Sequence, residues 1–150
     1  MKKSFMSAAI LMLFAIAVKA QILTPVHWSY AAKKISKDEA IVFVKATIDP
    51  GWHVYSQYVK EGGPVKTSFT FDPPKEYTLI GTTQEPKPIT RNEKVFSMDV
   101  SFFENSVIFQ QKVKLKSATA NVTGKFEYMA CNDEKCLPPD EVTFSVAFVP

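Results

Sequence analysis

The chain has 150 residues, of which 46% are apolar, and this is enough for one domain that buries its own core. Its formal net charge of +3 comes from Lys2, Lys3 and Lys19, because removing them leaves 15 of the 18 basic side chains against 15 acidic ones. The charge therefore gives no basis for a nucleic-acid partner or for binding to an anionic membrane surface.

Residues 1–20 have the organisation of a secretory signal peptide. A basic start is followed by an apolar run over residues 8–18, and the small residues Val18 and Ala20 stand at the −3 and −1 positions of a cleavage site. The apolar run is short for a membrane span, which makes an uncleaved anchor the weaker alternative. We therefore predict an exported domain over residues 21–150, periplasmic or secreted, where an oxidising environment favours the pairing of cysteines.

Alternating apolar and polar residues predict short strands through the first half of this domain. The clearest covers residues 40–48, whose apolar residues fall in phase and leave Lys45 on the other face. The turn sequence Asp49-Pro50-Gly51 follows it. Residues 81–94 are polar and rich in Pro and Thr, so we predict a surface connection there. The strands predicted in this half cover residues 24–34, 40–48, 52–55, 67–71 and 77–80.

The second half repeats the strand pattern, without an apolar period of 3.6 residues that would indicate a helix. Its clearest strand covers residues 107–115, in which only Gln111 interrupts the apolar face. Eight or nine strands separated by turn signals predict an all-β fold, a sandwich of antiparallel strands. The strands predicted in this half cover residues 95–103, 107–115, 125–129 and 142–148.

Both cysteines lie in one short stretch, residues 126–139, with the sequence FEYMACNDEKCLPP. Alternating runs precede and follow it, so we predict a β-hairpin-like unit whose connection carries Cys131 and Cys136. Disulfide exchange needs one sulfur that a partner can reach and a second one close enough to resolve the mixed disulfide, and this spacing meets the second need. The spacing is not Cys-x-x-Cys and no βαβ pattern accompanies it, which argues against a thioredoxin fold.

Two other interpretations of the cysteines remain open on the residues alone. A purely structural bridge across so short a loop contributes about 2 kcal/mol in the chain-entropy model, a small gain for a domain of this size. A metal site would combine Cys131 and Cys136 with His27 and His53, but the spacing matches no structural zinc pattern, and we expect no metal and no cofactor. The acidic residues between the cysteines outweigh the single lysine there, which disfavours a thiolate and slows reaction with random thiols.

Three segments of the sequence are distinctive: residues 126–139 with the cysteine pair, residues 48–57 (IDPGWHVYSQ), and the aromatic-rich residues 92–109. Together they resemble the N-terminal periplasmic domain of DsbD-type thiol:disulfide interchange proteins. The resemblance extends over essentially the whole predicted domain. It implies an immunoglobulin-like β-sandwich that accepts reducing equivalents from a thioredoxin-like domain and passes them to oxidised oxidoreductases in the periplasm.

The resemblance also implies roles for individual residues. Cys136 would form the intermolecular disulfide, and Cys131 would resolve it. Phe96, within residues 93–98, matches the aromatic residue of a loop that caps the pair at rest, while His53 and Tyr55 stand where the family has aromatic side chains beside the cysteines. Without the resemblance, Phe96 and Tyr55 would be interpreted as core or rim packing, and His53 as a satisfied turn or core histidine.

We therefore predict an exported thiol–disulfide exchange domain that relays reducing equivalents through Cys131 and Cys136, between a thioredoxin-like donor and oxidised extracytoplasmic proteins. As an enzyme it would be a protein-disulfide reductase that acts as a relay, and no small-molecule substrate is expected. DsbD-type proteins continue into a membrane domain and a thioredoxin-like domain, so we expect another chain to supply the membrane electron donor. The alternative is a secreted β-sandwich binding module with a structural Cys131–Cys136 disulfide, whose potential would lie below about −300 mV.

Overall fold

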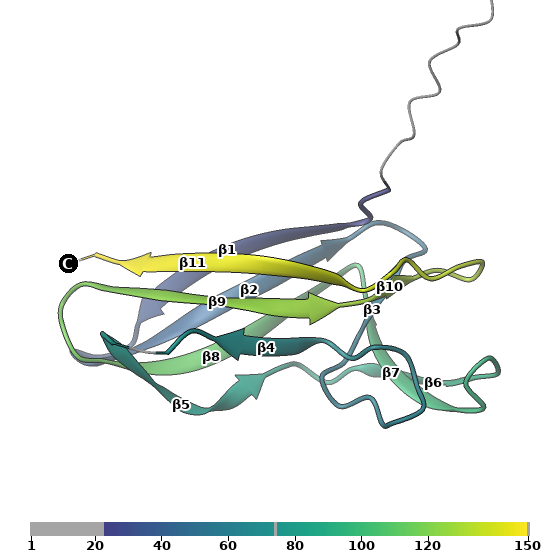
Figure 1. The fold of residues 1–150 in the computed structure, drawn as a ribbon, viewed down its shortest axis with the longest axis horizontal. Helices are drawn as coiled ribbons and strands as arrows, with labels where there is room; N and C mark the ends of the chain where they lie inside the picture. Colours follow the sequence, from purple (N-terminus) through teal and green to yellow (C-terminus); the bar gives the residue numbers. More distant parts are fainter. Residues whose placement is uncertain (1–22, 74, 150) are drawn as a thin grey trace, which may run out of the picture.

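The computed structural model describes residues 23–73 and 75–149 (Figure 1). The predicted signal peptide over residues 1–20 lies outside the described residues. In the described part, the chain forms strands joined by turns and loops and has no helix, which confirms the predicted all-β fold. The strands are β1 (Val26–Lys34), β2 (Glu39–Ile48), β3 (His53–Tyr55), β4 (Ser68–Phe71), β5 (Tyr77–Gln84), β6 (Ile89–Glu93), β7 (Met98–Glu104), β8 (Ser106–Leu115), β9 (Ala120–Tyr128), β10 (Ala130–Cys131) and β11 (Asp140–Phe148).

Four antiparallel strands form the larger sheet of the sandwich, in the order β1-β2-β8-β5. At its centre, β2 and β8 bury every second residue, as their alternation predicts. Gln111 is the polar member of the buried face of β8. Its side-chain amide accepts a hydrogen bond from Thr83 Oγ1 (3.0 Å) and donates one to the carbonyl of Ile80 (3.2 Å). The break in the apolar pattern is therefore a buried polar group with partners.

The opposite sheet has three antiparallel strands in the order β11-β9-β4. Aromatic side chains fill the space between the two sheets around Phe126 of β9, whose ring centroid lies 4.4 Å from that of Trp28 and 5.4 Å from that of Phe69. Gly124 allows β4 to approach β9, because a Cβ atom there would lie 2.5 Å from the carbonyl oxygen of Thr70. We call these two sheets and the core between them the sandwich body.

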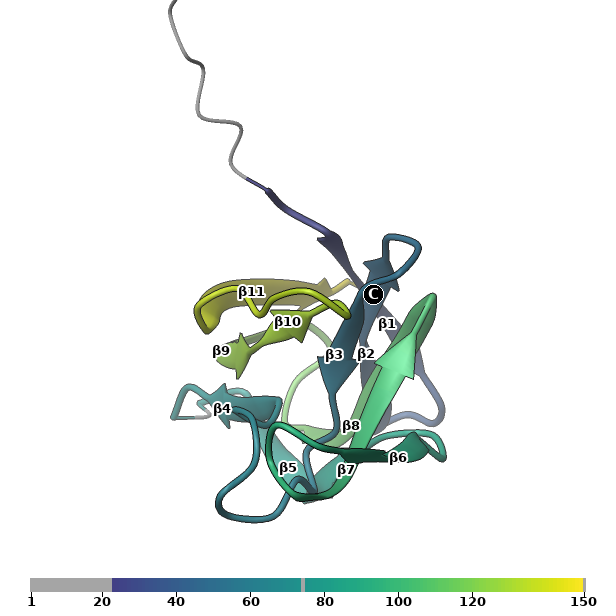
Figure 2. The ribbon, with the colours of Figure 1, turned by 90° about the vertical axis from the view of Figure 1, so that its right-hand side faces the viewer.

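A third sheet, the end sheet, closes one end of the body in the order β10-β3-β7-β6 (Figure 2). Its strands continue strands of the body: β3 follows β2 after one turn, β7 leads into β8, and β10 follows β9. In the first of these turns Gly51 has a φ of 81° and Pro50 precedes it, the pattern of a type II turn. The body therefore fixes the position of β3 beside β10, although the two strands lie far apart in the sequence.

The structure differs from the surface connection predicted over residues 81–94. β5 continues to Gln84, past an irregularity in its pairing with β8, and residues 89–93 form β6 at the edge of the end sheet. The side chains of β6 are mostly exposed, so no apolar alternation marked this segment as a strand. Backbone pairing with β7, and not burial of an apolar face, defines it.

Candidate functional site

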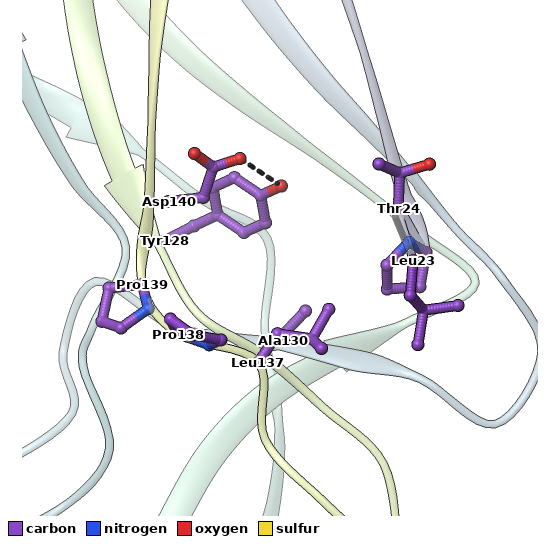
Figure 3. Close-up of a pocket in the computed structure, with 9 residues that line it drawn as sticks. Leu23, Thr24, Tyr128, Ala130, Leu137, Pro138, Pro139 and Asp140 are labelled. Carbon is purple, nitrogen blue, oxygen red and sulfur yellow. Dashed lines mark hydrogen bonds between the residues drawn. The ribbon is translucent and has the colours of Figure 1, made fainter. Parts of the chain in front are cut away.

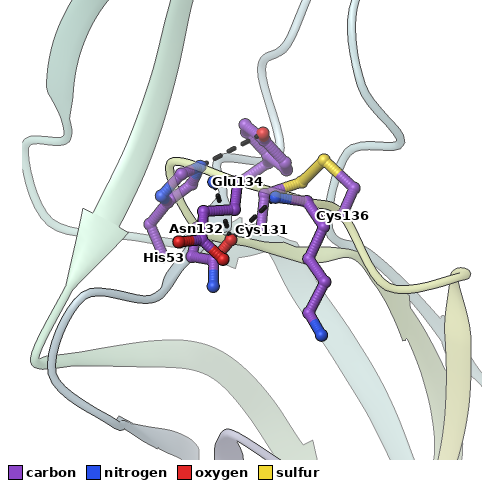
Figure 4. Close-up of a disulfide and its surroundings, with 7 residues drawn as sticks. His53, Cys131, Asn132, Glu134 and Cys136 are labelled. Carbon is purple, nitrogen blue, oxygen red and sulfur yellow. Dashed lines mark hydrogen bonds between the residues drawn. A yellow bond between two sulfur atoms is a disulfide. The ribbon is translucent and has the colours of Figure 1, made fainter.

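Cys131 and Cys136 are joined by a disulfide in the hairpin that connects β9 to β11 (Figure 4). They form an isolated antiparallel bridge with Cα atoms 4.0 Å apart. The two cysteines occupy a non-hydrogen-bonded pair, the position at which opposite strands approach most closely. The pairing expected in an oxidising compartment is therefore present. Backbone hydrogen bonds of 2.9 Å flank the bridge on both sides, from Asn132 N–H to Lys135 O and from Leu137 N–H to Ala130 O.

One side chain holds the turn between the two cysteines. The Oδ1 atom of Asn132 accepts hydrogen bonds from the backbone N–H groups of Glu134 (2.9 Å) and Lys135 (2.8 Å). Asn suits this position because its short amide reaches backbone donors two and three residues further on. Asp133, Glu134 and Lys135 are exposed, so the turn presents its charges to solvent and to any partner that approaches.

The two bonded cysteines differ in accessibility. Cys131 is 1% exposed, whereas Cys136 belongs to the exposed residues. Cys131 is part of a small second core, together with Tyr55, Val100 and Phe102. A thiolate from outside can therefore approach Cys136, and the sulfur that leaves in such an attack is that of Cys131.

His53 and Tyr55 approach the disulfide from β3. His53 stands directly opposite Cys131 in the pairing of β3 with β10, and its Nε2 atom lies 3.2 Å from the Tyr55 hydroxyl. Both side chains are buried, and the ring of His53 also packs against Phe102, with 4.9 Å between centroids. Burial lowers the pKa of His53 from its ordinary value of 6.5, which favours the neutral imidazole. Burial, followed by the negative charge of Glu93, raises the pKa of Tyr55 to about 12.

Phe96 approaches the disulfide from the turn between β6 and β7. Its side chain is half-buried and packs against the second core, which contains Tyr55 and Cys131. The neighbouring Val95 is 88% exposed, so consecutive residues of this turn face the core and the solvent. Two backbone hydrogen bonds close the turn: Phe96 N–H to Glu93 O (3.1 Å) and Ser97 N–H to Lys94 O (3.2 Å).

The residues singled out from the sequence line one pocket of about 320 Å³, which we call the disulfide pocket. Three chain segments that are distant in sequence contribute to it: β3, the β6–β7 turn and the cysteine hairpin. His27 is not among its lining residues, because it lies on β1 with its Nε2 atom 3.4 Å from an Asp49 carboxylate oxygen. Within residues 23–73 and 75–149, no three His, Cys, Asp or Glu side chains gather in a way that could hold a metal ion. The five residues brought together are His53, Tyr55, Phe96, Cys131 and Cys136.

A second pocket of about 430 Å³ lies beside the cysteine hairpin (Figure 3). Ala130 and Leu137, the residues that flank the bridged cysteines, contribute to its lining, as strand alternation requires for the face turned away from the sulfurs. At its rim the Tyr128 hydroxyl donates a hydrogen bond to Asp140 Oδ2 at 3.4 Å. The lining is mostly apolar and includes neither cysteine.

The family described as "Thiol:disulfide interchange protein DsbD, N-terminal" matches residues 19–147 of the sequence. The chain belongs to this family. No curated protein sequence matches it. Membership of the DsbD N-terminal family, together with a bonded cysteine pair at a pocket, supports thiol–disulfide exchange as the general function of the domain.

Solved structures of DsbD N-terminal domains share this fold. The N-terminal periplasmic domain of ScsB from Proteus mirabilis aligns with a TM-score of 0.59 at 17% identity, over 84% of this chain and 47% of that one, so the chain spans about half the length of that protein. The DsbD N-terminal domain of Neisseria meningitidis in the reduced form aligns with a TM-score of 0.56 at 16% identity, over 86% and 92% of the two chains. A chain in the structure of the complex between the DsbD and PilB N-terminal domains of the same organism aligns with a TM-score of 0.54 at 15% identity, over 83% of this chain and 87% of that one. These likenesses confirm the predicted immunoglobulin-like β-sandwich.

The charged neighbours of the site were not predicted from the sequence. Glu93 lines the disulfide pocket, and Arg91 lies above the ring of Phe102, with its Cζ atom 4.6 Å from the centroid. The Nε atom of Arg91 is also 3.2 Å from a Glu93 carboxylate oxygen. The signal that could have found them is their i, i+2 spacing, since both share one face if the segment is a strand. Among the described residues, no helix has the length and apolar character needed to cross a membrane.

Proposed function

We propose that this domain is a redox relay of the periplasm, which accepts reducing equivalents from a thioredoxin-like protein and passes them to oxidised extracytoplasmic proteins. The observation that carries the proposal is the contrast between the two bonded cysteines, one exposed and the other buried behind it. Such an arrangement gives a partner access to one sulfur and keeps the second within reach for resolution. A bridge that served stability alone would need neither feature.

In the proposed cycle, a donor thiolate attacks the Sγ atom of Cys136. The Cys131–Cys136 bond breaks, a mixed disulfide forms between the donor and Cys136, and Cys131 leaves as a thiolate that takes up a proton. A second donor thiolate then attacks the donor sulfur of the mixed disulfide, which releases oxidised donor and the reduced domain. Two electrons and two protons have moved. Cys136 next attacks the disulfide of a client, and Cys131 displaces the reduced client.

The neighbours in structure support a protein partner and a periplasmic location. The ScsB domain is described as periplasmic, and the DsbD N-terminal domain of Neisseria meningitidis forms a complex with the PilB N-terminal domain. By analogy we propose that residues 1–20 direct export, that residues 21–150 form the exchange domain, and that a membrane electron donor keeps the thioredoxin-like partner reduced.

We further propose that Phe96 caps the disulfide pocket in the absence of a partner. Its half-buried side chain packs against the core that holds Cys131, and it is carried by a short turn between β6 and β7 that two backbone hydrogen bonds close. A partner that approaches Cys136 would have to displace this ring. The cap would then limit reaction with small thiols and admit a protein that can move the turn.

Trapping of a mixed disulfide tests the relay. In Cys131→Ser the exposed Cys136 has no resolving partner, so the domain should accumulate a covalent complex with a thioredoxin-like oxidoreductase that lacks its own resolving cysteine. The matched control is Cys136→Ser, which leaves only the buried thiol and should trap little. Absence of a complex with Cys131→Ser, together with a reduction potential below about −300 mV, would instead identify a structural bridge in a binding module.

A further inference from the structure

Cys131 has to lose and regain a proton in every cycle of the proposed exchange, although it is 1% exposed. Cys136 is exposed and can exchange its proton with water. Cys131 lacks such direct access, so its ionisation requires a neighbouring group that accepts a proton. Among the buried side chains of the described residues, the imidazole of His53 is the one whose ordinary pKa lies near neutrality.

We propose that His53 is the proton-exchanging group of Cys131. Its imidazole takes the thiol proton when Cys131 attacks a mixed disulfide, and returns the proton when Cys131 leaves. The inference rests on the proposed exchange function and names a specific residue for its proton transfers. It differs from a packing role, which would require only the shape of the ring.

The position of His53 carries the proposal. In the pairing of β3 with β10 it is directly opposite Cys131, and side chains at such positions have Cβ atoms about 4.5–5.5 Å apart on the same face of a sheet. Both residues line the disulfide pocket. The ring is held by the 3.2 Å contact between Nε2 and the Tyr55 hydroxyl and by packing against Phe102. Figure 4 shows the imidazole beside the cysteine bridge, with its hydrogen bond to the phenol.

The charged side chains that influence the pKa of His53 come from β6, from β7 and from the cysteine hairpin. Burial is the main influence on its pKa and lowers it, so that the neutral, proton-accepting form predominates near pH 7. The tyrosine in contact with His53 keeps its own proton, because its pKa is about 12. The charged groups are Arg91, which also lowers the pKa of His53, and Glu93, Glu104 and Asp133, which raise it.

The proton transfer fits into the exchange step without any further reactant. With a client held through Cys136, the Cys131 thiol gives its proton to the His53 imidazole, and the resulting thiolate attacks the Sγ atom of Cys136. The bond between Cys136 and the client breaks, and the client leaves as a thiolate that takes a proton from water. The imidazolium then releases its proton to solvent. In the opposite direction, the imidazolium protonates Cys131 as the donor thiolate displaces it.

The test follows the reduction of the disulfide by dithiothreitol between pH 6 and pH 9, in the full chain and in His53→Phe. In the unaltered protein the imidazolium fraction rises as the dithiothreitol thiolate fraction falls, so the rate should change little on the acid side of this range. In His53→Phe only the thiolate fraction matters, and the rate should fall about tenfold for each pH unit. The two rates should converge near pH 9 and differ by about tenfold or more at pH 6.

Two profiles that run parallel across the whole pH range would overturn the proposal, because a loss of packing slows the reaction equally at every pH. His27→Phe is the matched control, since His27 is an exposed residue of β1, outside the disulfide pocket. Its profile should match that of the unaltered protein. Failure of the proposed relay would be seen in a different experiment, as the absence of a trapped partner on Cys136 in Cys131→Ser. The kinetics with dithiothreitol do not depend on that outcome, so the two failures can be told apart.

A measurement on the unaltered protein keeps the proposal testable if His53→Phe does not fold. The chain contains two histidines, so their ring proton resonances can be followed by NMR in the disulfide and dithiol forms. In the dithiol form the His53 signal should show a second inflection at the pH where Cys131 ionises, because neighbouring groups titrate as a pair. The His27 signal should show none. A His53 titration curve that is the same in both redox forms would contradict the proposal.

Discussion

The sandwich body and the end sheet of this molecule are built differently. In the body, β2, β8 and β9 have nine or ten residues each, and their apolar faces meet in one continuous core around Phe109 and Phe126. In the end sheet, β3 and β10 have three and two residues. Among the described residues, the buried cluster there has four members, Tyr55, Val100, Phe102 and Cys131.

Buried polar residues show the same contrast. Three of the five in the described residues lie in β3 or near it, namely His53, Ser56 and Thr67. Each has a partner: Ser56 Oγ donates to the Glu85 carboxylate, and Thr67 Oγ1 donates to the carbonyl of Tyr55 at 2.5 Å. Such groups add less stability than apolar burial, and leaving one unpaired costs about 1–3 kcal/mol. Substitutions in the body should therefore have the larger effects on stability, whereas substitutions in the end sheet should act mainly on the chemistry of the disulfide.

The largest effect on stability should come from Phe126→Ala. Phe126 is 1% exposed and contacts aromatic rings of both sheets, so its removal leaves a cavity in the body and should cost about 3–5 kcal/mol. Urea denaturation measures the loss. Phe43→Ala is the matched control, because Phe43 lies on the outer face of β2 and should cost much less. If the disulfide of the folded Phe126→Ala variant were reduced at a changed rate, the packing of the body would also control the chemistry of the end sheet, and the proposed division of roles would be wrong.

A smaller loss of stability should follow Gly124→Ala. The added methyl group would lie 2.5 Å from the Thr70 carbonyl oxygen and 2.9 Å from the Phe144 ring, so β4 and β9 must move apart. Overpacking of this kind costs about 1–3 kcal/mol. Lys125→Ala, at the next position and on the exposed face, should change the free energy of unfolding by less than about 0.5 kcal/mol. Equal midpoints of urea denaturation for the two variants would contradict this account.

The same contrast explains which parts of the fold could be predicted from the sequence. The strands of the body bury one face, so alternation identified β2 and β8 with nearly correct bounds. β6 buries almost nothing, and its pairing with β7 leaves no apolar signature. The part of β5 that extends to Gln84 contains Thr83, whose buried hydrogen bond to Gln111 is a long-range contact that leaves no pattern in the sequence.

The candidate site was predictable where its evidence is local. The spacing of Cys131 and Cys136 indicated a hairpin with a closely spaced pair, and the structure contains that bridge. The i, i+2 spacing of Arg91 and Glu93 would place both on one face of a strand, but it does not show that this face lies beside the cysteines. That position, like the contact of β3 with β10, is a long-range feature that a single sequence does not encode as a pattern. The burial of Cys131 and the exposure of Cys136 likewise result from packing of the end sheet.

Phe96→Ala should change the chemistry and leave the body intact. Removing the ring opens the disulfide pocket, so reduction by a small thiol such as glutathione should become faster, by about two- to tenfold, because access limits exchange rates. The midpoint of thermal unfolding should hardly move, since Phe96 lies outside the main core. Val95→Ala is the control in the same turn, where an 88% exposed side chain should have no effect on the rate. An unchanged rate in Phe96→Ala would show that Phe96 is not a cap.

The smallest effect should be a dependence of stability on pH near neutrality, which originates in the end sheet. Burial lowers the pKa of His53 in the folded protein, so below about pH 6.5 the unfolded chain binds a proton that the folded chain does not. Stability should therefore be complete above pH 6.5 and decrease as the pH falls through the pKa of the folded state. Burial raises the pKa of four tyrosines above the ordinary value of 10, so their phenols keep their protons throughout this range; they are Tyr30, Tyr55, Tyr77 and Tyr128. The measurement is the midpoint of thermal unfolding at pH 7.5 and at pH 5.5, in the full chain and in His53→Phe. The midpoint should fall less between these two pH values in the variant. An equal fall in both proteins would show that the acid sensitivity originates in the body and not at the redox site.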